Sequence, residues 1–253
     1  MKYYLKITII ILLIILLSPI STRALDLKGP ISEYQKIKTK IPTLSSNQES
    51  PEYLAIKKEQ LIKISSILVV SLSSDRDMIF TLQSIDQTQK NQLAVIIQTS
   101  VDKIVAQSSK IALAENLNDL KTISKLILDL WQSTHTLYKS SLAQMLNSEF
   151  DNITTDTASN IDAIKTESAR LKSQNKDVTL LNSKVEEAES ILSQIRVVIS
   201  TNQQLVSGID KNFNTNSTFE QFLQSLADSQ KLVLKMQQSL SDAELEVNRY
   251  STK

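Results

Sequence analysis

Apolar residues recur at helical spacing along most of the chain beyond residue 51. In the last part of the sequence they fall at heptad positions interrupted only by Ser229, and the series comprises Phe219, Phe222, Leu226, Val233, Met236, Leu240, Ala243, Val247 and Tyr250. Spacings that alternate between four and three residues line one side of a helix and form a seam against a partner helix. The pattern predicts a long helix over residues 219–250, preceded by a loop at residues 209–216.

A second seam of the same kind precedes that loop. Its members are Leu181, Val185, Ala188, Leu192, Ile195 and Ile199. Gly208 fits the end of this helix, because glycine readily adopts the positive φ that closes a last helical turn. The polar run at residues 173–177 predicts the turn before the helix, with Asp177 or Thr179 as its N-cap.

Earlier apolar positions predict further helices, with less distinct ends. The first helix should begin after Pro51, since proline suits a first helical turn. Ser73, Ser74 and Asp75 are N-cap residue types and predict a break, although a continuous helix through them is the alternative. The pattern gives four helices here, over residues 52–72, 78–114, 117–147 and 150–172.

The distribution of proline and glycine supports an all-helical chain. All four prolines lie in the first 51 residues, and Gly208 is the one glycine after Gly29. A many-stranded β fold needs turns rich in these residues, whereas helix interiors exclude both. Short turns make successive helices antiparallel. We therefore predict an all-α fold, an elongated antiparallel helical bundle with coiled-coil-like packing over residues 52–253, with a sub-division near residues 148–150 as an option.

The first residues have the three parts of a secretory signal. Lys2 and Lys6 precede an apolar run from Ile7 to Leu17, and small residues follow up to Ala24. The run is shorter than the roughly 20 apolar residues that a membrane-spanning helix needs. We expect a signal peptide over residues 1–24, cleaved near Ala24, and an extracytoplasmic protein that is secreted, periplasmic or at the cell surface. An uncleaved membrane anchor is the alternative.

The segment between the predicted leader and the helices differs in composition. Residues 25–51 contain Gly29, three spaced prolines and a basic stretch with Lys36, Lys38 and Lys40. Proline interrupts regular structure, and polar residues keep such a segment hydrated. We predict a flexible linker.

The charge balance makes two classes of partner improbable. Lysine and arginine number 28 against 27 aspartates and glutamates, and three of the basic residues (Lys2, Lys6 and Arg23) lie in the leader, leaving 25 against 27. Nucleic-acid binding and anionic-membrane binding normally need a basic field. We expect no nucleic-acid partner, and contact with a membrane only through an uncleaved leader. The lack of cysteine excludes disulfides and thiolate metal sites.

Trp131, His135 and Tyr138 form the one local cluster of aromatic and titratable side chains. Their i, i+4 and i+7 spacing places them on one face of a helix. Trp and Tyr are favoured anchors at contact surfaces, so the cluster is a candidate ligand or partner contact. Packed core with polar tips at its edge is the interpretation that we favour.

No residue pattern predicts catalysis. His135 is the single histidine, and the positions one turn away, Trp131 and Lys139, supply no second metal ligand. Glu186, Glu187 and Glu189 follow a helix start and lack the oxygen-rich loop that a divalent cation prefers, so they predict a hydrated helix face. We expect a non-enzymatic protein with no catalytic residue, metal or cofactor.

One stretch resembles known sequences. Residues 160–198 contain Leu171-Lys172-Ser173, Asp177-Val178 and Val185-Glu186-Glu187-Ala188. The stretch resembles helical hairpins in exported, uncharacterised coiled-coil proteins of small-genome uncultured bacteria. The resemblance covers about forty residues, is partly compositional, and implies a helical fold and no activity.

Together these patterns predict a helical spacer or protein-interaction module at the cell surface. Its partner would be an envelope or surface protein, or a second copy of the chain. Two alternatives stay open: a small-ligand-binding helical bundle that uses the face of Trp131, and a helical membrane-active protein.

Overall fold

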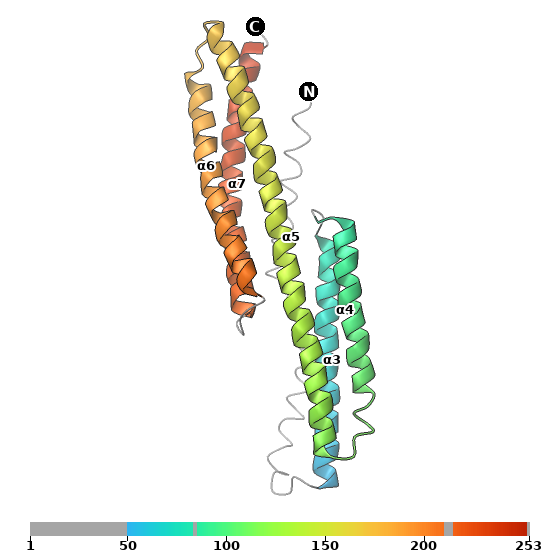
Figure 1. Cartoon of the computed structure of the whole chain (residues 1–253). Helices are drawn as coiled ribbons and strands as arrows, with labels where there is room; N and C mark the ends of the chain where they lie inside the picture. Colours follow the sequence, from blue (N-terminus) through green and yellow to red (C-terminus); the bar gives the residue numbers. More distant parts are fainter. Residues whose placement is uncertain (1–49, 83–84, 210–214, 252–253) are drawn as a thin grey trace. The chain divides into compact units, whose positions relative to one another are not determined.

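The computed structural model describes residues 50–82, 85–209 and 215–251. The predicted signal peptide, its cleavage site and nearly all of the predicted linker lie outside these residues. The described part contains the helices α3 (Pro51–Thr81), α4 (Gln87–Ser108), α5 (Leu117–Ser173), α6 (Thr179–Ile209) and α7 (Thr215–Ser251) (Figure 1). Helix covers 91% of the described residues, and none of them forms a strand. The prediction of an all-α fold is confirmed.

The chain divides into two compact units whose boundary lies between Ser141 and Leu142, inside α5. The first unit holds α3, α4 and the first part of α5, and the second holds the remainder of α5 with α6 and α7 (Figure 1). No helix of the described segments combines the length and the apolar character that crossing a bilayer requires.

In the first unit, aliphatic side chains from all three helices form the core. Leu72 and Ile79 of α3, Ile97 of α4 and Ile127 of α5 are fully buried. The ion pair between Asp75 and His135 and the contact between Met78 and Tyr138 lie at matching positions of α3 and α5, so these two helices run in the same direction. α4 follows α3 and runs antiparallel to it (Figure 1).

In the second unit, the predicted α6 seam is buried, and it packs against the α7 seam, which is buried except at Leu240, Val247 and Tyr250, where it is half-buried. α6 and α7 are antiparallel, since Lys184 pairs with Asp242 at 3.4 Å and Tyr250 donates a hydrogen bond to the carbonyl of Asp177. The α6 seam continues with its four-three spacing through a fully buried Asn202. Heptad spacing therefore identified the correct faces of both helices.

The predicted break at Ser73–Asp75 is wrong, and the continuous helix that was the alternative is observed. The buried positions Leu72, Asp75 and Ile79 keep the helical period across this stretch. The break lies instead at residues 82–86, where the Asp86 carboxylate accepts hydrogen bonds from the amides of Thr88 and Gln89 at 2.8 and 3.2 Å. These bonds lower the pKa of Asp86 and cap α4.

The predicted break between residues 147 and 150 is also wrong, because α5 is continuous from Leu117 to Ser173. Polar residues occupy part of the buried face here, which weakened the apolar pattern without ending the helix. The buried series runs through Leu146, Phe150, Ile153, Thr157 and Ile161. Thr157 satisfies its hydroxyl by donating to the carbonyl of Ile153 at 2.8 Å.

The remaining helix ends were predicted with mixed success. α5 begins just after the expected break at residues 115–116, where Asn116 accepts from the amide of Asn118 and Asp119 accepts from that of Glu115, both at 2.9 Å. The turn predicted at residues 173–177 is present. Asn175 adopts a φ of 58°, and the amide of Lys176 donates back to the carbonyl of Leu171 at 3.1 Å.

Gly208 does not have the predicted role. It lies inside the last turn of α6, which ends at Ile209, and its φ is not positive. A side chain at this position would meet Thr218 at 3.8 Å, an ordinary packing distance. The helix therefore does not need glycine here for backbone geometry.

Candidate functional site

Trp131, His135 and Tyr138, the predicted contact residues, form a row of rings on one face of α5. The Trp131 and His135 rings are stacked, with centroids 5.0 Å apart and planes 14° from parallel. The His135 and Tyr138 rings are tilted by 31°, with centroids 6.4 Å apart. Helical spacing thus brings the three side chains into contact without any help from another element.

A residue that the sequence analysis assigned to a cap completes this cluster. Asp75 of α3 lies with its Oδ2 2.8 Å from the Nδ1 of His135. Both side chains are largely shielded, with exposed fractions of 8% for Asp75 and 18% for His135. A buried carboxylate requires such a partner, because desolvation of an unpaired charge is costly. The pair therefore fixes α3 against α5 at this level of the first unit.

Tyr138 faces the same helix. Its hydroxyl donates to the Sδ of Met78 at 3.4 Å, and the side chain is buried. Burial raises the pKa of the phenol, and the negative charge of Asp75 raises it further. The hydroxyl therefore keeps its proton throughout the physiological range, which makes Tyr138 a hydrogen-bond donor and unsuited to act as a general base.

The third ring has an unsatisfied polar atom. The indole Nε1 of Trp131 is buried and has no hydrogen-bond partner among the described residues. In that part of the chain no set of three His, Cys, Asp or Glu side chains is arranged to hold a metal ion. The cluster thus offers one imidazole paired with one carboxylate, in the setting of a packed polar contact between two helices.

A groove lies between α3 and α5 in the first unit. Its volume is about 650 Å³, and its lining comes from the first turns of α3 and of α5. The groove includes Leu128 and Gln132 but none of Trp131, His135 and Tyr138. The groove could not be predicted from local sequence patterns, because the lining residues of α3 and α5 are too far apart along the chain to form a local motif.

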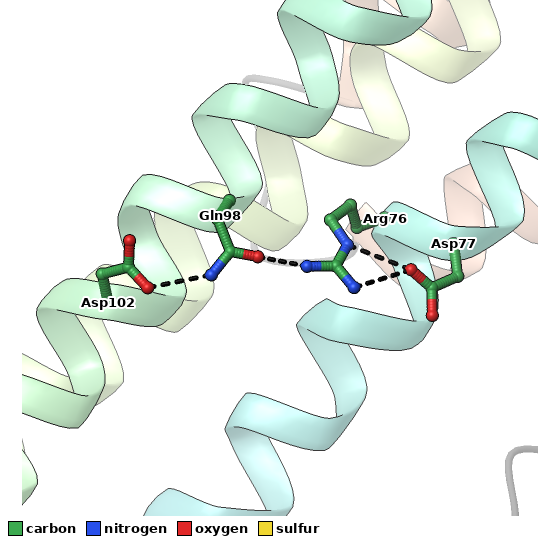
Figure 2. Close-up of polar contacts among 4 residues, drawn as sticks. All are labelled: Arg76, Asp77, Gln98 and Asp102. Atoms are coloured by element: carbon green, nitrogen blue, oxygen red, sulfur yellow. Dashed lines mark hydrogen bonds and ion pairs between the residues drawn. The ribbon is translucent and has the colours of Figure 1, made fainter.

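Polar contacts also connect α3 with α4. The guanidinium of Arg76 lies between Asp77 and Gln98, donating to both, and the amide of Gln98 donates to Asp102 at 2.8 Å (Figure 2). The pair of Arg76 with Asp77 is exposed, with 68% of the Asp77 side chain accessible. Such exposed pairs contribute little free energy. These contacts therefore show which positions of α3 and α4 lie opposite each other, and they add little to the stability of the fold.

The exposed side of α4 carries unusually few charges. The helix contains only Lys90, Asp102 and Lys103 as charged residues, and Lys90 is buried. We define the α4 outward face by six exposed uncharged residues of the helix, which are Gln92, Val95, Ile96, Thr99, Val105 and Ala106. Val95 is 64% exposed and Val105 is 53% exposed. Aliphatic side chains that remain accessible on a charge-poor helix are typical of contact surfaces.

The acidic residues near the start of α6 engage in ion pairs with nearby lysines. Glu189 pairs with Lys165 of α5 at 2.8 Å, and Glu187 pairs with Lys184 at 3.3 Å. A hydrogen bond from Ser239 and the pairing with Lys184 lower the pKa of Glu187. The pair of Lys165 with Glu189 connects α5 with α6, whereas the pair of Lys184 with Glu187 lies within α6.

Comparison of the chain with protein-family models, with curated proteins and with solved structures finds no significant match. The resemblance of residues 160–198 to exported coiled-coil proteins therefore remains an expectation.

Proposed function

We propose that this protein is a non-enzymatic, extracytoplasmic helical module that binds a protein partner at the cell surface through the α4 outward face. The extracytoplasmic location rests on the leader pattern, in which Lys2 and Lys6 precede the apolar run from Ile7 to Leu17. The partner is an envelope or surface protein. The proposal rests on one observation, which is that the α4 outward face exposes aliphatic side chains on a helix with few charges.

Exposed aliphatic and aromatic residues are unevenly distributed between the two units. Ten large apolar residues of the first unit are exposed, which are Ile62, Val70, Phe80, Val95, Ile96, Val105, Leu113, Leu126, Leu128 and Leu137, against four in the second, Leu180, Val197, Leu234 and Leu245. Burying such side chains against a partner gains about 25 cal/mol per Å² of apolar surface. The first unit therefore has more to gain from association than the second.

Charge decides which part of the first unit is best suited to contact. Desolvating a charge opposes binding, and cores of protein interfaces are accordingly depleted of charged residues. α4 has two exposed charges, Asp102 and Lys103, in one turn of the helix. The turns before them present Gln92, Val95, Ile96 and Thr99 with no charge. A partner can cover this area without burying an unpaired ion.

Two matched substitutions test the proposal. Val95 on α4 and Val197 on α6 are exposed to 64% and 67%, so a glutamate at either position should leave stability within about 0.5 kcal/mol of wild type. We expect V95E to lower recovery of the cross-linked partner from the native envelope about tenfold, because a buried interfacial charge costs 1.4 kcal/mol or more. V197E should recover it like wild type.

The measurement is affinity recovery of the tagged protein after chemical cross-linking in its native envelope, followed by binding of the purified partner to each variant. Thermal melts of V95E and V197E serve as the control for folding. Equal recovery by V95E and wild type would refute the assignment of the α4 outward face, as would equal losses in both variants.

A further inference from the structure

The groove between α3 and α5 combines an apolar floor with a basic rim. Leu61 and Leu120 are each only 6% exposed and lie at its base together with Ile64. The rim carries Lys57 from α3 and two lysines, Lys121 and Lys125, from α5. The volume of about 650 Å³ falls within the range of roughly 300 to 1,000 Å³ that is common for small-molecule sites.

The lysines of the rim outnumber the carboxylates of the lining. Lys121 and Lys125 are exposed, one helical turn apart, and neither has an ion-pair partner in the segments that the structure covers. Like charges at this spacing destabilise a helix by a few tenths of a kcal/mol. Lys57 donates to the Oε1 of Gln60 at 3.3 Å and lies 5.3 Å from the centre of the Tyr53 ring.

Three positive charges therefore face a single acidic residue of the lining, Asp129. The groove keeps an excess of positive charge although the chain as a whole is nearly neutral. Such a local excess attracts an anion, most strongly where apolar walls limit access of water.

The direction of the helices adds to this field. α3 and α5 run the same way and begin at the same end of the first unit (Figure 1). The groove is lined by residues from the first turns of both helices. The positive ends of two helix dipoles thus lie near each other. The first amides of α5 are already bonded to Asn116, with the amide of Asp119 at 3.0 Å. The lysine ammonium groups are therefore the available donors.

We propose that this groove binds an anionic amphiphile, with its carboxylate or phosphate head held by Lys57, Lys121 and Lys125 and its hydrocarbon chain covering Leu61, Ile64 and Leu120. The site gives the small-ligand alternative a location other than the Trp131 face. The groove shares no residue with the α4 outward face. Evidence against the proposed protein partner would therefore leave the proposed ligand site unaffected, and the reverse also holds.

Displacement of a fluorescent probe tests the ligand class. Anilinonaphthalene sulfonate, an apolar ring system with an anionic group, is titrated into the purified protein and then displaced by dodecanoate or dodecyl phosphate below their micelle concentrations. We expect both to compete, and expect dodecyltrimethylammonium and inorganic phosphate not to compete at the same concentrations. Equal competition by the cationic amphiphile would overturn the role of charge, and equal competition by inorganic phosphate would overturn the role of the chain.

Substitutions locate the site. K121Q/K125Q should weaken dodecanoate binding about tenfold or more, since every 1.4 kcal/mol of lost interaction is a factor of ten. K103Q/K110Q removes the same charge from exposed lysines outside the groove and should bind like wild type. D129N should bind more tightly, because it removes the opposing carboxylate. Circular dichroism and urea titrations of each variant establish that it is folded.

Equal loss in both lysine pairs would show that only net charge matters, and would overturn the proposal. Unchanged binding in K121Q/K125Q would do the same. Failure of wild-type protein to bind either the probe or dodecanoate would also refute it, whatever the outcome for the α4 outward face.

Discussion

Asp75 and His135 form a shielded polar contact between α3 and α5 in the first unit. The Asp75 carboxylate is shielded from water, and its Oδ2 lies 2.8 Å from the Nδ1 of the His135 imidazole. Two residues further along α3, Asp77 is also paired, with Arg76 at 2.8 Å, but is 68% exposed. The same residue type thus occurs in one helix in a buried and in an exposed pair.

This contrast yields a stability prediction. D75A should lower the free energy of unfolding by about 1 to 3 kcal/mol, because it leaves the shielded His135 without its partner. D77A should lower it by less than about 1 kcal/mol, because exposed ion pairs contribute little. Urea denaturation followed by circular dichroism measures both. Equal effects would mean that the buried pair is no more important than the surface pair.

Tyr138 makes stability depend on pH. Burial, and after it the charge of Asp75, raises the pKa of the phenol above its ordinary value of 10.0. The folded state therefore retains a proton that the unfolded chain releases, so the stabilisation is present below the ordinary pKa and is lost as pH rises above it. We expect the free energy of unfolding to begin to fall at about pH 9 and to keep falling as the pH rises further above the ordinary pKa of the phenol.

Y138F should remove part of that fall. At neutral pH the substitution loses only the hydrogen bond to Met78, which should cost less than about 1 kcal/mol. Denaturant titrations of wild type and Y138F at each pH give the comparison. The same fall in both proteins would show that Tyr138 does not determine the alkaline limit.

At the scale of elements, heptad spacing predicted the faces of α6 and α7, while cap residue types alone misplaced two helix ends. Ser73, Ser74 and Asp75 have good capping chemistry, yet the buried face of α3 continues through them. Serine and threonine can also lie within a helix by donating to a carbonyl one turn back, as Ser65 does to Leu61 at 2.8 Å. Residue type at a cap is therefore weaker information than the continuity of the apolar period.

After α3 the apolar period misleads in the other direction, because it continues in the sequence where the helix ends. Leu82 and Ile85 are buried, with exposed fractions of 1% and 5%, and they fit a helical period in the sequence. In the structure they belong to the connection and cover the end of the hydrophobic core. A connection that packs its own apolar residues is not distinguishable from helix by periodicity.

The candidate site was predictable only within one helix. Trp131, His135 and Tyr138 are near in sequence, and the geometry of a single helix brings them together. Asp75 lies 60 positions before His135, so their contact depends on how α3 packs on α5. The groove has the same origin, since Lys57 and Lys121 are placed by different helices. Local spacing contains no information on such pairings.

At the scale of the whole molecule, two units of three helices share α5, and they differ in surface chemistry. α4 of the first unit has few charges, whereas exposed ion pairs such as Lys165 with Glu189 and Lys184 with Asp242 connect the helices of the second. We infer that association with a partner involves the first unit. We predict that a protein partner covers the α4 outward face in the native envelope.

Site-specific photo-cross-linking would detect such a partner. A photoreactive amino acid replaces Val95 in one variant and Val197 in another, since the two valines have nearly equal exposure. After irradiation in the native envelope, we predict a discrete cross-linked protein from position 95 and none from position 197. Cross-linking from position 197 alone, or from neither position, would contradict the prediction that a protein partner covers the α4 outward face.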